Sequence, residues 1–320
     1  MVDVACFGEV LWDWYELPKR THGSTTFVRM IGGALANVAV GLARLGVRSS
    51  VVGGVGRDRF GDELVDTLTR ERVDMSHAVR LPNRTGLAFI SRDKKGQPTF
   101  LFYRHESADV SVEDVHIEPS MANAKWVAFG SSTLQARGLR KATHRFLAAA
   151  ATNNAHVFFD LNIRAHLWKD ASDMKRRVEA ALPGAHVIKA SWDDLRAWGD
   201  PEKALKRVRK AAPGGVVLIT RGDGVATATG AFGQIDLPAR RARCVDATGA
   251  GDAFIAGVLA TLVRNRAMTK SSLWSDAGFW RHALDIGHRM GQKAVTMPGA
   301  VTGLLRLENI QSKLQKNAHG

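Results

Sequence analysis

A carboxylate stands directly after a glycine-rich turn in the segment Asp246-Ala247-Thr248-Gly249-Ala250-Gly251-Asp252. The apolar residues after it predict a helix that begins in this turn. Backbone amides at a helix start lack intrahelical acceptors and carry positive potential, and small side chains let an anion approach them. Gly249, Ala250 and Gly251 therefore form a candidate anion hole, with Asp252 beside it as a proton acceptor. Such a turn suits phosphoryl transfer to a hydroxyl group, although a glycine-rich helix start that contains an aspartate explains the same residues.

A second group of small and polar residues lies near the start of the chain, in Gly32-Gly33-Ala34-Leu35-Ala36-Asn37. Paired glycines permit close approach of the backbone to a ligand. Asn37 stands one helical turn further on, and its amide offers both a donor and an acceptor. This combination suits recognition of a polyol, whose hydroxyl groups also donate and accept. An ordinary loop followed by a polar residue at a helix start is the alternative for either feature taken alone.

The elements that must position these residues alternate between strand-like and helix-like segments, which is typical of a parallel sheet flanked by helices. The predicted strands are residues 2–8, 49–53, 126–130, 157–160, 186–190 and 216–220, with a short run at 242–245 before the glycine-rich turn. The predicted helices are residues 34–45, 60–72, 139–152, 174–182 and 201–212. We therefore expect an α/β core with a doubly wound, mostly parallel sheet.

Two stretches interrupt this alternation, at about residues 9–30 and 77–104. Each contains strand-like pieces rich in β-branched and aromatic residues, without a helix between them. The two stretches can pair into one small β-sheet beside the core, and we expect this sheet to act as a lid that closes over a bound ligand. An edge hairpin with no moving role is the alternative. Residues 1–320 are thus predicted to form one domain that contains the lid.

Bulk composition limits the classes of protein to consider. The chain has 320 residues, of which 45% are hydrophobic, so it can bury a full core and is neither disordered nor fibrous. Its net charge of +14 favours anionic partners. The basic residues are spread along the chain without a dominant arm, so nucleic-acid binding is not expected as the main function. No segment resembles a signal peptide or a membrane span, which predicts a cytoplasmic protein.

Several other classes are excluded because their motifs are missing. No Gly-Lys dipeptide occurs, which excludes the phosphate-binding loop of P-loop enzymes. The protein-kinase motifs His-Arg-Asp and Asp-Phe-Gly are absent, as are the His-Glu-x-x-His of metalloproteases and the Gly-x-Ser-x-Gly of hydrolases. Only Cys6 and Cys244 are present, far apart in the sequence, so neither a disulfide framework nor a structural zinc site is predicted.

The two polar segments together resemble the two signature motifs of the ribokinase-like (PfkB) carbohydrate kinases, in the same order along the chain. The similarity extends over nearly the whole chain, including Gly8-Glu9, Asp160-Leu-Asn162-Ile-Arg164 and Thr220-Arg-Gly222. The resemblance implies a ribokinase-like fold and ATP-dependent phosphorylation of a sugar, with ATP and Mg²⁺ as cosubstrates. A monovalent cation such as K⁺ is a further candidate.

The resemblance also implies roles for individual residues at the sugar end of the site. Asp252 corresponds to the catalytic base, and the sugar hydroxyls are held by Asp13, Gly32, Gly33 and Asn37. Within the family, the chain is similar to fructokinases and to 2-keto-3-deoxygluconate kinases. The specificity residues implied by that similarity are Tyr103, Arg104 and Arg164.

The identity of the sugar stays open between two chemical classes. An arginine can fork onto a carboxylate or donate to hydroxyls, so these arginines do not choose between an acidic and a neutral sugar. The Gly-Gly-Ala-Leu-Ala-Asn segment favours fructokinase, which makes fructose 6-phosphate. The alternatives are a 2-keto-3-deoxygluconate kinase or another PfkB sugar or nucleoside kinase. A catalytically silent sugar- or nucleotide-binding regulator is the alternative outside the enzymes.

The nucleotide side departs from the family pattern at two places. The family's Asn-x-x-Glu is replaced by Ser191-Trp192-Asp193-Asp194, so Asp194 is expected to act on Mg²⁺ only through water. The turn that begins at Thr220 is one residue shorter than the Thr-x-Gly-x-x-Gly turn that the family places along the nucleotide. The residues implied to contact the nucleotide are Asn162, Lys189, Ser191, Thr220, Gly222 and Gly224. Family members often dimerise through their lids, so a homodimer through the lid is the arrangement to test.

Overall fold

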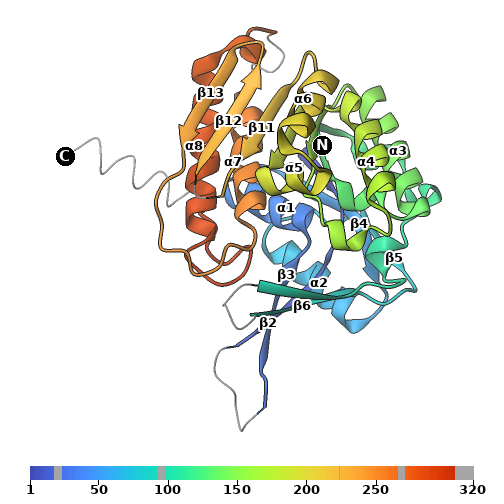
Figure 1. The fold of residues 1–320 in the computed structure, drawn as a ribbon. Coiled ribbons are helices and arrows are strands. Elements are labelled where there is room, and N and C mark those ends of the chain that lie inside the picture. The colour runs from blue at the N-terminus through green and yellow to red at the C-terminus, as the bar shows by residue number, and fades with distance from the viewer. Residues whose placement is uncertain (18–23, 93–97, 223, 266–270, 307–320) are drawn as a thin grey trace.

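Two β-sheets organise the part of the chain that the computed structural model describes, which is residues 1–17, 24–92, 98–222, 224–265 and 271–306. The large sheet has nine strands in the order β13-β12-β11-β10-β9-β8-β1-β4-β5 (Figure 1). Their bounds are β1 Val2–Phe7, β4 Ser49–Gly56, β5 Ala78–Leu81, β8 Ala124–Gly130, β9 His156–Asp160, β10 Val187–Ser191, β11 Val216–Thr220, β12 Val225–Gly230 and β13 Gly233–Pro238. Only the pairings of β12 are antiparallel, so the predicted doubly wound, mostly parallel sheet is confirmed.

The order of the large sheet reverses between β1 and β8. From β1 the chain builds outward to β4 and β5, and it then returns to the other side of β1 to build β8, β9, β10 and β11. The connections after β1 and β8 therefore leave in opposite directions and open a crevice at the carboxyl ends of the strands. In open α/β sheets, ligands bind at this kind of switch point.

Helices cover both faces of the large sheet (Figure 1). One hydrophobic cluster lies under α1 Ala34–Arg44, α2 Arg59–Arg70, α7 Ala250–Arg264 and α8 Ala277–Ala294. A second lies under α3 Arg137–Thr152, α4 Ala171–Ala181, α5 Trp192–Trp198 and α6 Pro201–Ala211. The helices pack their apolar residues against the sheet, as the alternation of strands and helices predicted, although some charged side chains, such as Asp194 of α5, are also buried.

The small sheet has four strands in the order β3-β2-β6-β7, with bounds β2 Leu11–Glu16, β3 Phe27–Gly32, β6 Gly86–Arg92 and β7 Pro98–Tyr103. We call these four strands the lid; they project from the core below α1 and α2 (Figure 1). Side chains alternate between its two faces. The inner face carries Asp13 and Phe102, and the outer face carries Trp14 and Tyr103.

Several elements differ from the sequence predictions. Residues 78–81 form β5 of the large sheet and not part of the lid, because they pair with β4. The run 242–245 is not a strand, since Val245 donates to the carbonyl of Val295 at the end of α8 instead of joining a ladder. The hairpin of β12 and β13 and helices α5 and α8 were not anticipated. Residues 18–23 and 93–97 of the two predicted lid stretches lie outside the described residues.

Candidate active site

The glycine-rich turn and Asn37 meet at the start of α7. Gly249 has φ +75°, and a side chain there would collide with Ala300, so glycine is required. The first helical hydrogen bond runs from the amide of Ala253 to the carbonyl of Gly249 at 2.8 Å, so the helix does not use the amides of Gly251 and Asp252. Asn37 Nδ2 donates to Asp252 Oδ2 at 2.9 Å. The fold thus joins two residues that lie 215 positions apart.

Asp246, the first residue of the turn, fixes its shape. One of its carboxylate oxygens accepts from the Thr248 amide at 3.0 Å and from the Thr248 hydroxyl at 2.7 Å. The other oxygen accepts from the Gly299 amide at 2.9 Å. Asp246 is buried. Its carboxylate therefore ties the turn to the segment after α8, and it leaves Asp252 as the carboxylate that faces Asn37.

Asp13 and Glu9 lie at the other end of the site, against the glycine pair. A side chain on Gly32 would meet the Asp13 carboxyl carbon at 2.5 Å, and one on Gly33 would meet the Glu9 carbonyl oxygen at 2.2 Å. Gly33 also has φ +98°. Both glycines are thus needed for packing within the chain, whatever ligand approaches them.

Glu9 bridges the crevice where the strand order reverses. Glu9 follows β1, and Ser132 follows β8 in a short 3₁₀ helix at Ser131–Leu134. Ser132 Oγ donates to Glu9 Oε2 at 2.6 Å, and the amide of Ala34 donates to Glu9 Oε1 at 3.2 Å. Glu9 therefore links the ends of two neighbouring parallel strands to the start of α1.

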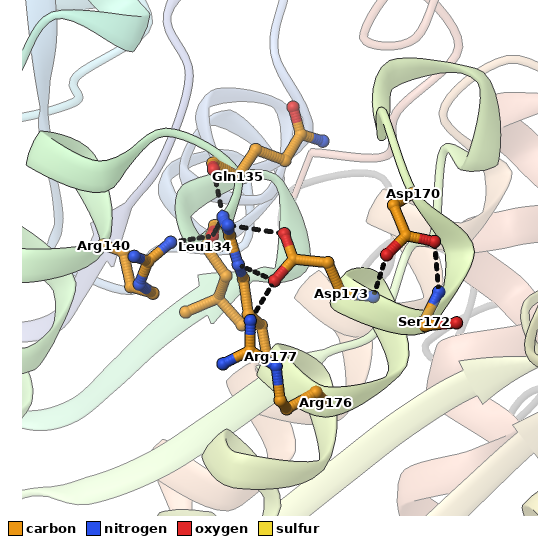
Figure 2. Close-up of polar contacts among 8 residues, drawn as sticks. All are labelled: Leu134, Gln135, Arg140, Asp170, Ser172, Asp173, Arg176 and Arg177. Atoms are coloured by element: carbon orange, nitrogen blue, oxygen red, sulfur yellow. Dashed lines mark hydrogen bonds and ion pairs between the residues drawn. The ribbon is translucent and has the colours of Figure 1, made fainter.

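Arginines from α3 and α4 hold the 3₁₀ helix that presents Ser132 (Figure 2). Arg177 Nη1 donates to the carbonyl of Leu134 at 3.1 Å and also to that of Gln135. Asp173 accepts from Arg177 Nε at 2.8 Å, which fixes the guanidinium. Arg140 donates to the carbonyl of Leu134 as well. Helices α3 and α4 thus hold the 3₁₀ helix that places Ser132 at the crevice.

Burial and neighbouring carboxylates shift the pKa of both central acids. Burial raises the pKa of Asp252, against the hydrogen bond from Asn37 and the positive charge of Arg164. Burial, together with the charges of Asp252 and Glu9, raises the pKa of Asp13 to about 8. A carboxylate whose affinity for a proton is increased is a stronger base when it is ionised.

The three predicted specificity residues do not share one location. Arg104 is buried at the end of the lid, where its charge acts on Glu9 and Asp13. Arg164 is exposed, and its charge acts on Asp252. Tyr103 is 61% exposed on the outer face of the lid, opposite to Asp13, so the fold does not bring it to the site. One step along a strand reverses the face to which a side chain points.

Lys189 lies beneath the glycine-rich turn. Its ammonium is 3.2 Å from Asp160 Oδ1, and a side chain added to Gly251 would meet it at 3.2 Å. Burial alone would lower the pKa of Lys189, but the charges of Asp160 and Asp194 raise it. This lysine is therefore a fixed buried cation close to Asp252, already paired with a carboxylate.

The carboxylate of Asp194 binds backbone amides and does not form an open position for a metal ion. Its Oδ1 accepts from the amide of Ile163 at 2.6 Å, and its Oδ2 accepts from the amide of Ser191 at 2.7 Å. Ser191 Oγ in turn accepts from the Asp194 amide, which completes a capping box at α5. The shorter carboxylate thus fixes the loop that carries Asn162, whose φ is +34°.

The other residues assigned to the nucleotide lie at the ends of adjacent strands. Ser191 ends β10 and is in register with Thr220, which ends β11. Gly222 follows with φ +57°, and Gly224 precedes β12. These residues and the start of α7 lie along one carboxyl edge of the sheet. The turn at Gly222 therefore shares one edge of the sheet with the turn at Asp252.

Three residues of this region were not assigned a role from the sequence: Glu9, Ser132 and Asp109. Glu9 lies two residues after the buried strand β1, and a carboxylate near a strand's carboxyl end is a signal that could have identified it. Ser132 and Asp109 lie in short 3₁₀ segments whose geometry has no distinctive sequence pattern. Their roles depend on tertiary contacts alone.

Two further observations on the described residues concern metal ligands and membrane-spanning helices. No group of three His, Cys, Asp or Glu side chains among them is arranged to hold a metal ion. Mg²⁺ in phosphoryl-transfer sites is usually held by one or two carboxylates and the substrate phosphates, so it needs no such cage. None of the helices in the described ranges is both long and apolar enough to cross a membrane.

Comparison with known proteins shows the family to which the chain belongs. Residues 1–306 match the family model described as pfkB family carbohydrate kinase. A fructokinase from Salmonella typhimurium is 35% identical over 279 residues, which cover 85% of this chain and 88% of that protein. The structure of a fructokinase with bound ATP from Xylella fastidiosa is similar with a TM-score of 0.87 and 28% identity, over 99% of both chains. A fructokinase double mutant from Vibrio cholerae O395, with fructose, ADP and potassium ion bound, has a TM-score of 0.85 and 27% identity, over 97% of this chain and 98% of that chain. The chain therefore belongs to the PfkB family of carbohydrate kinases, which confirms the class of enzyme expected from its two motifs.

Proposed function

We propose that this kinase transfers the γ-phosphoryl group of ATP to the 6-hydroxyl of fructose, with Asp252 as the general base. The observation that carries the proposal is the hydrogen bond between Asn37 and Asp252 at the start of α7. It joins the polar group suited to a sugar hydroxyl to the carboxylate suited to removing its proton. It does so beside amides that the helix leaves free.

Asp252 activates the sugar hydroxyl in this proposal. The carboxylate takes the hydroxyl proton as the sugar oxygen forms a bond to the γ-phosphorus, and the bond from that phosphorus to the β-phosphate oxygen breaks to release ADP. The raised pKa of Asp252 suits a proton acceptor near neutral pH. The amides of Gly251 and Asp252 support the proposed anion hole, because they can donate to the transferring group in its charged state. Lys189 adds a fixed positive charge below them.

The sugar lies between Asp13 and Asp252 in this proposal. Asn37 Oδ1 is a buried acceptor without a hydrogen-bond partner among the described residues, and a sugar hydroxyl would satisfy it. Asp13 offers two further carboxyl oxygens above Gly32, which can accept from or donate to sugar hydroxyls according to its protonation. The choice of fructose is supported by the fructokinase relatives and by the neighbour whose structure contains fructose.

ATP is proposed to lie along the carboxyl edge, with its phosphates at the start of α7. The free amides and the close approach allowed at Gly251 fit a phosphate group there. Asn162, Ser191, Thr220, Gly222 and Gly224 would line the rest of the nucleotide. Mg²⁺ would neutralise phosphate charge, and Asp194 would act on it only through water, because its side chain is buried and held by two backbone amides. The ATP-bound and potassium-bound neighbours support ATP as donor and K⁺ as a candidate activator.

The lid is proposed to have two further roles. Phe102 on its inner face stacks on His166 of the core with ring centres 5.6 Å apart, a contact that closure over a sugar would use to exclude water. Its outer face is proposed to pair with a second copy of the chain. The reaction is placed in the cytoplasm, where ATP is the usual phosphoryl donor.

The test is a coupled assay of ADP release with ATP, Mg²⁺ and fructose. We expect sugar-dependent release by the purified protein, and a loss of about 10³-fold in kcat for Asp252→Asn with little change in the Kd for fructose. The product should be fructose 6-phosphate, identified by its conversion with phosphoglucose isomerase. Ribose, 2-keto-3-deoxygluconate and nucleosides complete the panel of acceptors.

Asp285→Asn is the matched control, because Asp285 is a carboxylate on α8 that is paired with Arg240 and Arg289 away from the site. Its activity should stay within about twofold of the wild type. ADP release that does not depend on a sugar, or full activity of Asp252→Asn, would contradict the assignment of the base. A response to nucleosides alone would contradict the choice of fructose.

A further inference from the structure

We propose that the site selects neutral sugars and rejects sugar acids, with Asp109 and Glu9 as the residues that impose this selection. The inference rests on the proposed function and concerns the chemical class of sugar that the same site accepts. Its basis is the pairing of Arg104, the buried cation at the sugar end.

Arg104 is already engaged by a buried carboxylate. Its Nε donates to Asp109 Oδ2 at 2.7 Å, and its Nη2 lies 2.5 Å from the same oxygen. The Asp109 side chain is fully buried, and that of Arg104 is only 10% exposed. Ser107 Oγ donates to the other oxygen of Asp109 at 2.5 Å. The Nε and Nη2 edge of the guanidinium is thus occupied and Asp109 balances its positive charge, while the remaining N–H groups on Nη1 and Nη2 can still donate to sugar hydroxyls.

The Asp109 carboxylate also faces the sugar end of the lid. A side chain on Gly86 would meet Asp109 Oδ1 at 2.4 Å, just as one on Gly32 would meet the Asp13 carboxyl. Gly32 and Gly86 both pair with Leu11 from opposite sides. Neighbouring strands lie about 4.8 Å apart, so the two carboxyl groups flank Leu11 on the inner face at roughly 10 Å from each other.

Glu9 adds a third acid to this end of the site. Burial alone would raise the pKa of Glu9, but the charge of Arg104 and the hydrogen bond from Ser132 lower it below its usual value. Glu9 is therefore ionised at neutral pH. Its negative charge raises the pKa of Asp13 and of Asp252, so it acts on the whole sugar end.

The balance of charge predicts which sugars bind. Glu9 and Asp109 stand against Arg104 alone at the lid, and the neighbouring Asp13 favours its protonated form. A hydroxyl can donate to these acids, whereas a sugar carboxylate would be repelled by them. Arg164 is the competing partner for a sugar carboxylate, because it is exposed near Asp252 and has no ion pair among the described residues.

The experiment compares two probes that differ in one group. D-fructose and D-arabino-2-hexulosonate have the same configuration at C3 to C5, and the second has a carboxylate in place of the C1 hydroxymethyl. We expect a wild-type kcat/KM at least ~100-fold higher for fructose, and a Kd ratio of the same order by calorimetry. Asp109→Asn keeps an acceptor for Ser107 and frees Arg104. The ratio of kcat/KM for fructose to kcat/KM for the acid should therefore fall about tenfold, mainly because the KM for the acid decreases.

Glu9→Gln is a second, independent test. Glutamine removes the negative charge but can still accept from the Ala34 amide, so this variant should also show a smaller preference for fructose over the acid. Asp3→Asn is the matched control. Asp3 is a buried aspartate paired with Arg48 and Lys125 at the opposite edge of the sheet, and its loss should leave the preference unchanged. Thermal melts identify variants that do not fold, and the Kd ratio of the wild type decides the question if neither variant folds.

Each outcome separates this inference from the proposed function. A wild-type enzyme that binds the acid as tightly as fructose overturns the inference, whichever sugar it phosphorylates. An unchanged preference in folded Asp109→Asn and Glu9→Gln also overturns it, and points to Arg164 as the determinant. Activity with another neutral sugar but not with fructose removes the fructose assignment and leaves the inference standing.

Discussion

Asp13 shows a conflict between folding and ligand binding within a single residue. Its pKa is raised from its ordinary value near 3.8 to about 8 by burial and by the charges of Asp252 and Glu9. The folded protein therefore favours the protonated carboxyl. The stability that the proton confers is complete below pH 3.8 and is lost as the pH rises through 8. Above pH 8 the fold contains an unfavourable buried charge, which sugar hydroxyls would stabilise.

Asp13→Asn should therefore stabilise the protein while it removes sugar binding. We expect the Tm to rise by roughly 5 °C at pH 9 and by much less at pH 5, because asparagine resembles the protonated acid. Thermal melts across this range, together with calorimetric titration of fructose, measure both effects. Asp3→Asn should behave oppositely and lower the Tm at pH 9, since Arg48 and Lys125 lower the pKa of Asp3 to about 2 against its burial. A Tm difference for Asp13→Asn that does not grow with pH would contradict the argument.

The positions of some of these residues follow from local sequence patterns, whereas those of others depend on tertiary structure. Asn37 and Asp252 belong to helix starts, whose glycines and apolar residues have a local signature, and their contact follows once the two helices are adjacent. Tyr103 was assigned to the site, but its face depends on the register of β6 and β7, which no local pattern determines. Arg104 lies near Glu9 and Asp13, yet no local pattern predicts its pairing with Asp109, which depends on the folded chain.

At the scale of the element, the outer face of the lid is the main exposed apolar feature among the described residues. Leu101 is 58% exposed and Tyr103 61%, and both lie beside Phe89 and Phe27. Apolar side chains gathered on one exposed sheet face are typical of a surface that another chain covers. A second copy of the chain presents the same face, as a two-fold dimer requires.

Leu101→Glu should therefore convert a dimer into a monomer. Sedimentation velocity at micromolar concentration is expected to show a dimer for the wild type and a monomer for the variant, because a charge would be buried without a partner in the interface. Val115→Glu is the matched control, since Val115 is 72% exposed in a 3₁₀ helix outside the lid. A monomeric wild type, or equal dissociation of both variants, would argue against pairing through the lid.

The elements themselves were predictable to different degrees. Parallel strands between long amphipathic helices have strong patterns, so β1, β8, β9 and α3 were found close to their observed bounds. The hairpin of β12 and β13 was missed, because its polar, partly exposed strands have little hydrophobic contrast. Residues 78–81 were assigned to the lid, since the sequence cannot show that this short segment pairs with β4.

At the scale of the whole molecule, the edge of the sheet opposite to the active site contains an aromatic stack with two histidines. His156 stacks on Trp126 with ring centres 5.0 Å apart and on Trp274 at 5.8 Å, and His186 lies 4.9 Å from His156. Burial lowers the pKa of both histidines. The Val157 amide donates to His186 Nδ1 at 3.0 Å, a bond that protonation of this nitrogen would break.

This stack should make the stability of the enzyme sensitive to mild acid. A histidine whose pKa is lowered by folding contributes stability above its unfolded pKa near 6.5, and that stability is lost as the pH falls below this value, because the unfolded chain then binds more protons. We expect the Tm of the wild type to fall between pH 7 and pH 5.5, a range in which most carboxylates stay ionised. His156→Phe keeps the stacking and removes the titrating ring, so its Tm should fall by roughly 2–4 °C less over the same range. The exposed His282 of α8 provides the control, and His282→Phe should reproduce the wild-type slope. If His156→Phe and the wild type lost stability in parallel, the acid sensitivity would have to arise elsewhere in the fold.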